Sequence, residues 1–85
     1  MKRILLVEDH SAFREAMATY LERDSDFEVA AQAGSLAEAR AIASTEFDVA
    51  VIDIYLPDGN GLDLVRQLRE DAPHKNVGTD GKRRS

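Results

Sequence analysis

The chain has no cysteine and no long apolar run. The lack of cysteine excludes a disulfide framework and a thiolate metal site. No apolar stretch approaches the length that a membrane-spanning helix needs. The basic start at residues 1–3 is followed by only a short apolar run before Glu8, which does not fit a signal peptide. We therefore expect a soluble, cytoplasmic protein with no membrane partner.

Positive charge is also scarce. The 85 residues carry 11 Lys and Arg against 16 Asp and Glu, a net charge of −5. The imbalance lies in residues 1–74, which hold 7 basic and 15 acidic side chains, whereas residues 75–85 hold 4 and 1. An acidic body is a poor surface for nucleic acid. We expect no direct nucleic-acid binding by this chain.

Three strands, each followed by a helix, are predicted from the apolar patterns. Runs rich in β-branched and aliphatic residues at 2–7 and 49–52 predict strands buried on both faces, and residues 27–33 predict a more polar edge strand. The resulting β-α-β-α-β-α order implies a parallel sheet with right-handed crossovers. The fold class is therefore α/β, with the first and third strands in the centre.

Ser11 is a good N-cap and is expected to cap the first helix. The second helix should follow the S-x-x-E capping box of residues 35–38. The third helix should begin at about residue 61. The third helix should end near residue 69, because Pro73 disfavours helix in the residue before it. Helical spacing assigns buried faces to Phe13, Ala16, Met17, Tyr20 and Leu21, to Leu36, Ala39, Ile42 and Ala43, and to Leu62, Val65 and Leu68, with Leu64 flanking them.

The pattern stops after Pro73. Residues 74–77 are able to begin a fourth strand, whereas residues 78–85 are predicted to form a loop or a disordered tail. We expect one small domain over residues 1–73 and a basic tail over residues 74–85. A domain of this size buries only about 60–65% of its unfolded surface, so its stability should be marginal.

Acidic side chains follow both central strands. Glu8 and Asp9 come directly after the first strand, and Asp53 comes directly after the third. Ligands bind at the carboxyl ends of strands in open α/β sheets, and neighbouring carboxylates repel unless a cation neutralises them. An all-oxygen ligand set favours Mg²⁺. Mg²⁺ beside a carboxylate suits phosphoryl transfer onto that carboxylate.

The segments VEDH at residues 7–10 and VIDIYLPDGNGLD at residues 51–63 resemble the receiver domain of bacterial two-component response regulators. The resemblance is strongest to the NarL/FixJ branch, which carries a LuxR-type effector. It covers residues 2 to about 73, which correspond to about the first three βα units of a five-unit fold. The chain therefore resembles a C-terminally truncated receiver. The resemblance implies a flavodoxin-like parallel sheet with strand order 2-1-3-4-5.

The resemblance also implies roles for particular residues. Asp53 would be the phospho-acceptor, and Glu8, Asp9 and Asp53 would hold Mg²⁺ together with the backbone carbonyl of Tyr55. The partner would be a histidine kinase. The chain would be a signalling module and not an enzyme.

An alternative function is a non-switching interaction or dimerisation module. Receivers end strand four with Ser or Thr and strand five with Lys, and here Thr79 and Lys82 have the right residue types without a matching apolar context. Without strands four and five, residues 48–53 would form a flat apolar edge that pairs with another chain. We therefore expect a homo-oligomer, joined at that edge or by exchange of segments around residues 73–78.

Overall fold

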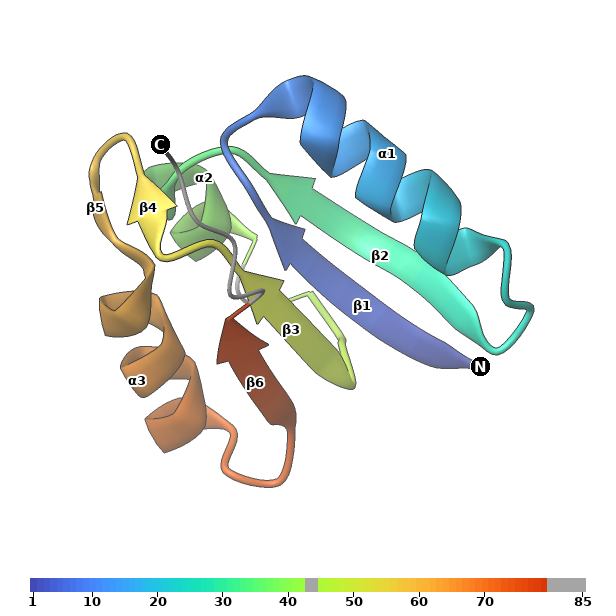
Figure 1. Ribbon diagram of the computed structural model, residues 1–85. Coiled ribbons are helices and arrows are strands. Elements are labelled where there is room, and N and C mark those ends of the chain that lie inside the picture. Colours follow the sequence, from blue (N-terminus) through green and yellow to red (C-terminus); the bar gives the residue numbers. More distant parts are fainter. Residues whose placement is uncertain (43–44, 80–85) are drawn as a thin grey trace.

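The computed structural model describes residues 1–42 and 45–79 (Figure 1). Three βα units are followed by one more strand of the same sheet, and a small antiparallel ribbon lies between the third strand and its helix. In chain order the elements are β1 (Lys2–Val7), α1 (Ser11–Glu22), β2 (Phe27–Ala33), α2 (Leu36–Ala41), β3 (Val49–Ile52), β4 (Tyr55–Leu56), β5 (Gly59–Asn60), α3 (Gly61–Asp71) and β6 (Asn76–Thr79).

The main sheet has the order β2-β1-β3-β6, and all of its neighbouring strands are parallel. This confirms the predicted α/β fold and the strand order borrowed from the receiver resemblance, with β6 in the fourth place. The first three strands have the predicted bounds. Residues 78 and 79, predicted to be loop, belong instead to β6. The predicted domain boundary after Pro73 stays a prediction, and β6 lies beyond it.

β3 is not an edge strand. It pairs with β1 on one side and with β6 on the other, so the prediction of an open edge at residues 48–53 is wrong. Asn76 donates its N–H to the Asp48 carbonyl at 3.1 Å, so the backbone groups of the next residue, Val77, face the outer edge. There the Val77 carbonyl accepts a hydrogen bond from Arg69 Nη2 at 3.0 Å. A short strand with a charged side chain over its edge discourages pairing with another chain.

The main core lies between the sheet and the pair α2 and α3. Successive strand residues point to opposite faces, so Leu5 and Val7 of β1 face this core, whereas Ile4 and Leu6 face α1. The main core cluster consists of Leu5, Val7, Ala33, Leu36, Ala39, Phe47, Ala50, Ile52, Leu56, Leu64, Val65, Leu68 and Val77. Ile42 packs against it as predicted, and Ala43 lies outside the described residues.

The buried stripe of α1 differs from the predicted one. Ala18 is buried and Met17 and Leu21 are half-buried, whereas Phe13 is 37% exposed and Tyr20 is 72% exposed. The helix lies along β2 and β1 (Figure 1), and its inward stripe is residues 14, 17, 18 and 21, which have the spacing of one helical face. Because α1 has apolar residues on several sides, periodicity alone chose the wrong stripe.

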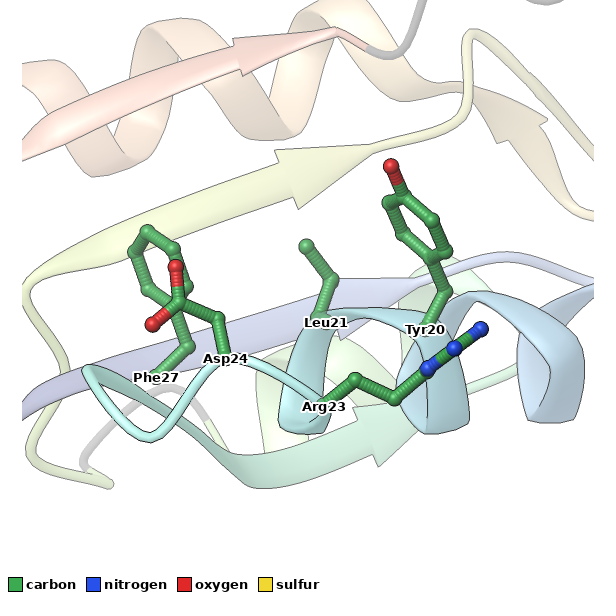
Figure 2. Close-up of a pocket in the computed structure, with 5 residues that line it drawn as sticks. All are labelled: Tyr20, Leu21, Arg23, Asp24 and Phe27. Atoms are coloured by element: carbon green, nitrogen blue, oxygen red, sulfur yellow. The ribbon is translucent and has the colours of Figure 1, made fainter.

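An open hollow of about 410 Å³ lies at the carboxyl end of α1. It is lined by Tyr20, Leu21, Arg23, Asp24 and Phe27 (Figure 2). Phe27 pairs with Lys2 at the amino ends of β2 and β1. The hollow therefore lies at the opposite end of the sheet from the acids that follow β1 and β3.

In α3 the buried side chains are Leu64, Val65 and Leu68, and the predicted core residue Leu62 is 37% exposed. The helix ends at Asp71, two residues beyond the predicted end near residue 69, and its C-cap Ala72 directly precedes Pro73. Within the described residues, no helix is both long enough and apolar enough to span a bilayer.

Candidate metal centre

Backbone hydrogen bonds carry the sheet one residue beyond β1 and β3. The Glu8 N–H donates to the Ala33 carbonyl at 2.9 Å, and the Asp53 N–H donates to the Val7 carbonyl at 2.8 Å. Val7 is in register with Ile52. Glu8 and Asp53 are therefore held side by side at the carboxyl edge of the sheet.

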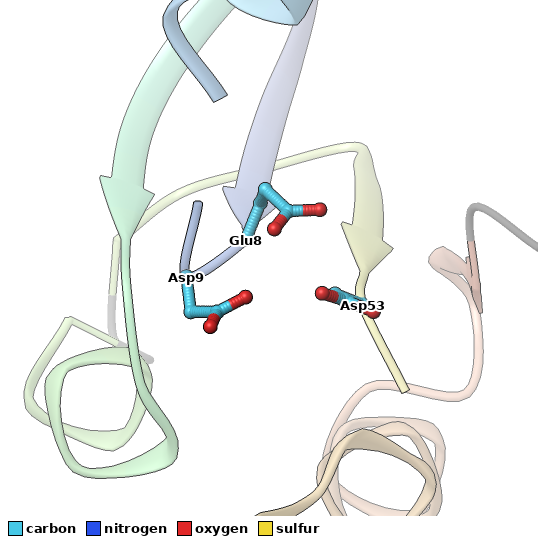
Figure 3. A group of neighbouring side chains, drawn as sticks. All are labelled: Glu8, Asp9 and Asp53. Atoms are coloured by element: carbon cyan, nitrogen blue, oxygen red, sulfur yellow. The ribbon is translucent and has the colours of Figure 1, made fainter. Parts of the chain in front are cut away.

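The three predicted acids converge at this edge. Glu8, Asp9 and Asp53 each offer one carboxylate oxygen, and these oxygens all lie within 4.8 Å of one another (Figure 3). Glu8 and Asp53 are fully buried at 0% exposure, and Asp9 is half-buried. Buried carboxylates at this spacing repel one another unless a cation or proton compensates their charge. The hard oxygen donors fit a divalent ion such as Mg²⁺.

Backbone N–H groups orient two of these carboxylates. The His10 N–H donates to Glu8 Oε2 at 2.9 Å, and the Tyr55 N–H donates to Asp53 Oδ1 at 3.1 Å. The Tyr55 side chain is 54% exposed, and its backbone carbonyl as a metal ligand stays a prediction. Glu8 and Asp53 are thus each oriented by the N–H group of the residue two positions further along the chain.

The turn from the acidic edge into α1 is closed by His10. His10 is the N-cap, and its Nδ1 accepts the Phe13 N–H at 3.2 Å. The prediction that Ser11 caps the helix is wrong, since Ser11 is already the first helical residue. The imidazole cap therefore fastens the turn that directly follows Asp9 to the first turn of α1.

Gly61 allows α3 to begin directly beside Asp53. A Cβ at this position would lie only 2.0 Å from the Asp53 carbonyl oxygen, and the Gly61 N–H donates to the Ile54 carbonyl at 2.7 Å. Asn60 is the N-cap of the helix, accepting the Leu62 N–H at 2.8 Å. Only glycine permits this close approach between the helix and the backbone of Asp53.

Asp58 joins the turn between β4 and β5 to α2. Its two carboxylate oxygens accept the N–H groups of Leu36 at 2.8 Å and Ala37 at 2.9 Å. These bonds, that of Leu36 first, hold the pKa of the Asp58 carboxyl below its ordinary value of 3.8. In the same turn, Gly59 has φ +154°, and a Cβ there would lie 2.6 Å from Leu36 Cδ1. The loop after Asp53 is therefore fastened to the start of α2.

The predicted capping box of α2 is present with one difference. Ser35 Oγ accepts the Glu38 N–H at 3.1 Å, as expected. The Glu38 side chain accepts the N–H of Gly34 at 2.6 Å, whereas the usual capping box uses the N–H of the cap residue itself. Ser35 and Asp58 thus satisfy N–H groups in the first turn of the same helix.

Sequence reasoning undervalued two residues near the site. Thr79 ends β6 and is in register with Ile52, the residue before Asp53, so a hydroxyl residue ends the fourth strand of the sheet. Arg14 was left out of the predicted core face because its side chain is charged. It nevertheless points inward and donates to the Glu8 carbonyl at 2.6 Å. Two sequence features could have identified these residues: Thr79 follows the aliphatic Val77 closely, and Arg14 has the helical spacing from Met17 of one buried face. Lys82 lies outside the described residues.

The chain matches known proteins over most of its length. A family model described as the response regulator receiver domain matches residues 4–78. The DNA-binding transcriptional activator DevR/DosR of Mycobacterium tuberculosis is 42% identical over 74 residues, which cover 86% of this chain and 34% of that protein. A protein-glutamate methylesterase/protein-glutamine glutaminase of Agrobacterium fabrum is 36% identical over 69 residues, 80% of this chain and 20% of that protein.

Solved structures agree with these sequence matches. The crystal structure of a two-component response regulator of the LuxR family from Aurantimonas sp. SI85-9A1 has a TM-score of 0.83 at 31% identity. The match covers 93% of this chain and 57% of that chain. The chain spans only about a third of the length of the DevR/DosR activator and a fifth of the length of the methylesterase. Both relatives contain the region that matches this chain, although one is named as a transcriptional activator and the other as an enzyme.

Proposed function

Because this chain belongs to the response regulator receiver domain family, we propose that it is a phospho-accepting receiver of two-component signalling. Asp53 is the acceptor in this proposal, and a histidine kinase is the donor. The observation that carries it is the convergence of Glu8, Asp9 and Asp53 within 4.8 Å, with two of the three fully buried. We expect the chain to act as a signalling module without nucleic-acid binding or enzymatic turnover of its own.

Mg²⁺ is the proposed cofactor, held by the carboxylates of Glu8, Asp9 and Asp53 and by the backbone carbonyl of Tyr55. When bound, it neutralises the clustered carboxylates and the charge on the transferred phosphoryl group. The spacing of the carboxylate oxygens supports this assignment. The His10 and Tyr55 N–H groups hold the two buried carboxylates in place, so little reorganisation precedes the reaction.

The proposed reaction forms one bond and breaks one. An oxygen of the Asp53 carboxylate attacks the phosphorus of a phosphohistidine, giving an acyl phosphate. The phosphorus–nitrogen bond breaks, and its electron pair returns to the imidazole of the donor. Acetyl phosphate reacts in the same way, with acetate as the leaving group. Positioning and charge neutralisation supply most of the catalysis in such transfers.

Thr79 is the proposed hydroxyl that contacts the phosphoryl group. It ends the fourth strand, which is where a receiver carries Ser or Thr, and the register of β6 with β3 supports this role. The non-switching alternative rested partly on the loss of this residue. With Thr79 in the fourth strand, the receiver assignment is favoured over that alternative.

A phosphorylation experiment tests the proposed function. The protein is incubated with acetyl phosphate and Mg²⁺, and its intact mass and the modified peptide are measured. We expect one phosphoryl group on Asp53, dependent on Mg²⁺ and absent from Asp53→Asn. Asp63→Asn is the matched control, because Asp63 is an exposed acid of α3 that pairs with Arg66. Equal labelling of Asp53→Asn and the unchanged protein would refute the assignment.

The remaining predictions about the chain belong to the same proposal. A cytoplasmic location fits a donor kinase that uses cellular ATP. A homo-oligomer is part of the proposal, and it would cover the exposed apolar side chains Phe13 and Tyr20 of α1. Light scattering across a concentration series measures it, and a single monomer mass at all concentrations would refute it.

A further inference from the structure

Arg14 lies on the inward stripe of α1 although it is charged. Its Nη1 donates to the backbone carbonyl of Glu8 at 2.6 Å. That carbonyl belongs to the peptide group that joins Glu8 to Asp9, so its orientation sets the directions in which both side chains leave the backbone. We propose that Arg14 is a positioning residue that holds Glu8 and Asp9 in the geometry that binds the cation. This inference rests on the proposed metal site.

Gly34 leaves the space that the Arg14 guanidinium occupies. A Cβ on Gly34 would lie 2.9 Å from Arg14 Nη1 and 3.3 Å from Glu38 Oε1. Gly34 follows β2 directly, and its N–H donates to that same Glu38 oxygen at 2.6 Å. The guanidinium therefore lies between the ends of β1 and β2, against a residue without a side chain.

The contact with Glu8 dominates the placement of the guanidinium. Arg14 Nε is buried and has no hydrogen-bond partner among the residues that the structure describes. An unpaired buried donor costs free energy, so the side chain does not adopt this position to satisfy all of its donors. The position instead brings one strong, charge-assisted hydrogen bond to the peptide group between two acids of the cluster.

Charge and positioning predict opposite effects of Arg14 on cation binding. A positive charge close to the cluster repels a cation, so an Arg14 that acted only through its charge would weaken Mg²⁺ binding, and its removal would strengthen it. An Arg14 that only stabilised the fold would leave the Mg²⁺ affinity of the folded protein unchanged. A positioning Arg14 is the one case in which its removal weakens Mg²⁺ binding.

The test compares Mg²⁺ dissociation constants of the full chain and three variants by calorimetric titration. Arg14→Met keeps the apolar stem and removes the guanidinium. Gly34→Ala keeps the charge and displaces the guanidinium. Arg66→Ala is the matched control, because Arg66 is an exposed arginine of α3 whose side chain is 73% exposed. Amide hydrogen exchange in the metal-free protein reports on this geometry without any ligand, because the Asp9 N–H belongs to the peptide group that Arg14 contacts and the His10 N–H donates to Glu8 Oε2.

We expect Arg14→Met and Gly34→Ala to weaken Mg²⁺ binding about tenfold, as the loss of outer-shell partners does at other metal sites. Exchange at Asp9 and His10 should become faster in both variants, and Arg66→Ala should match the unchanged protein. Equal or tighter Mg²⁺ binding by a folded Arg14→Met or Gly34→Ala variant would overturn the inference and leave the proposed function intact. Failure of the unchanged protein to bind Mg²⁺ would overturn both.

Discussion

Replacing Gly61 with alanine should destabilise the protein and disturb its acidic site together. The added Cβ would lie 2.0 Å from the Asp53 carbonyl oxygen, 2.9 Å from the Asp53 carbonyl carbon and 3.0 Å from Ile52 Cγ2. Real Cβ atoms essentially never approach within 3.0 Å of another atom, so the carbonyl or the start of α3 must retreat by about 1 Å. Overpacking of this kind typically costs roughly 1–3 kcal/mol.

The cost should fall near the upper end of that range, about 2–3 kcal/mol, because the obstacle is backbone and not the end of a flexible side chain. Functional groups must be held within roughly 0.5 Å of their productive geometry. A 1 Å shift at Asp53 should therefore also weaken Mg²⁺ binding. The matched control is Gly78→Ala, because a Cβ on Gly78 meets nothing within 4 Å.

Urea unfolding followed by far-ultraviolet circular dichroism gives the free energy of unfolding of each protein. We expect Gly78→Ala to be neutral or up to about 1 kcal/mol more stable, since glycine weakens a strand interior. A Gly61→Ala protein within about 0.5 kcal/mol of the unchanged chain, the usual range of harmless surface changes, would refute the account of this contact. So would equal losses in the two variants.

Three further predictions test the fold around the site. Leu64→Ala should lower the free energy of unfolding by about 2–5 kcal/mol. Leu62→Ala should lower it by less than about 1 kcal/mol, because Leu62 is 37% exposed. Equal losses in the two variants would contradict the observed buried face of α3. The folded-state pKa of Asp58 lies below 3.8, so its contribution to stability is complete above that pH and is lost as the pH falls through the folded pKa. Urea midpoints between about pH 5 and pH 3 should therefore fall less steeply for Asp58→Asn, and an unchanged slope would count against the Asp58 contacts. Arg69→Ala uncovers the Val77 carbonyl at the edge of β6. Light scattering should therefore show more association of Arg69→Ala than of Arg66→Ala at the same concentration. Equal association of the two variants would contradict the assigned role of Arg69.

The strands and the acidic cluster could be predicted from the sequence because they depend on short-range patterns. The aliphatic runs at residues 4–7 and 49–52 leave little alternative to buried strands, and an acid directly after such a strand must lie at the carboxyl edge of the sheet. Parallel pairing then brings Glu8 and Asp53 together whatever the details of the loops. The convergence at 4.8 Å follows from this topology.

The fourth strand could not be predicted with the same certainty, because non-local contacts hold it. β6 contains a single buried aliphatic residue, Val77, and a glycine. Its pairing with β3 is supported by Lys75, whose ammonium group donates to the carbonyl of Phe47 and lies 5.0 Å from the centre of its ring. These partners are nearly thirty positions away in the chain, so no local pattern reveals them.

The predicted buried faces of α1 and α3 and the predicted N-cap of α1 were partly or wholly wrong for a different reason. α1 carries apolar side chains on more than one side, and the polarity of Arg14 hid the true inward stripe. His10 is an unusual N-cap, and the adjacent Ser11 is a better one by preference, so the boundary was displaced by one residue. In α3, Leu62 and Leu64 are equally apolar, and only packing against β3 and β6 shows which of them is buried.

Titration with Mg²⁺ tests most directly whether the acids that follow β1 and β3 form one site. The account predicts saturable binding of one Mg²⁺ per chain with a roughly millimolar dissociation constant and a rise in melting temperature, because the ion prefers the folded state. Glu8→Gln, Asp9→Asn and Asp53→Asn should each lose this binding, and Asp63→Asn should keep it. Binding that survives in Asp53→Asn, or its absence from the unchanged protein, would contradict the account.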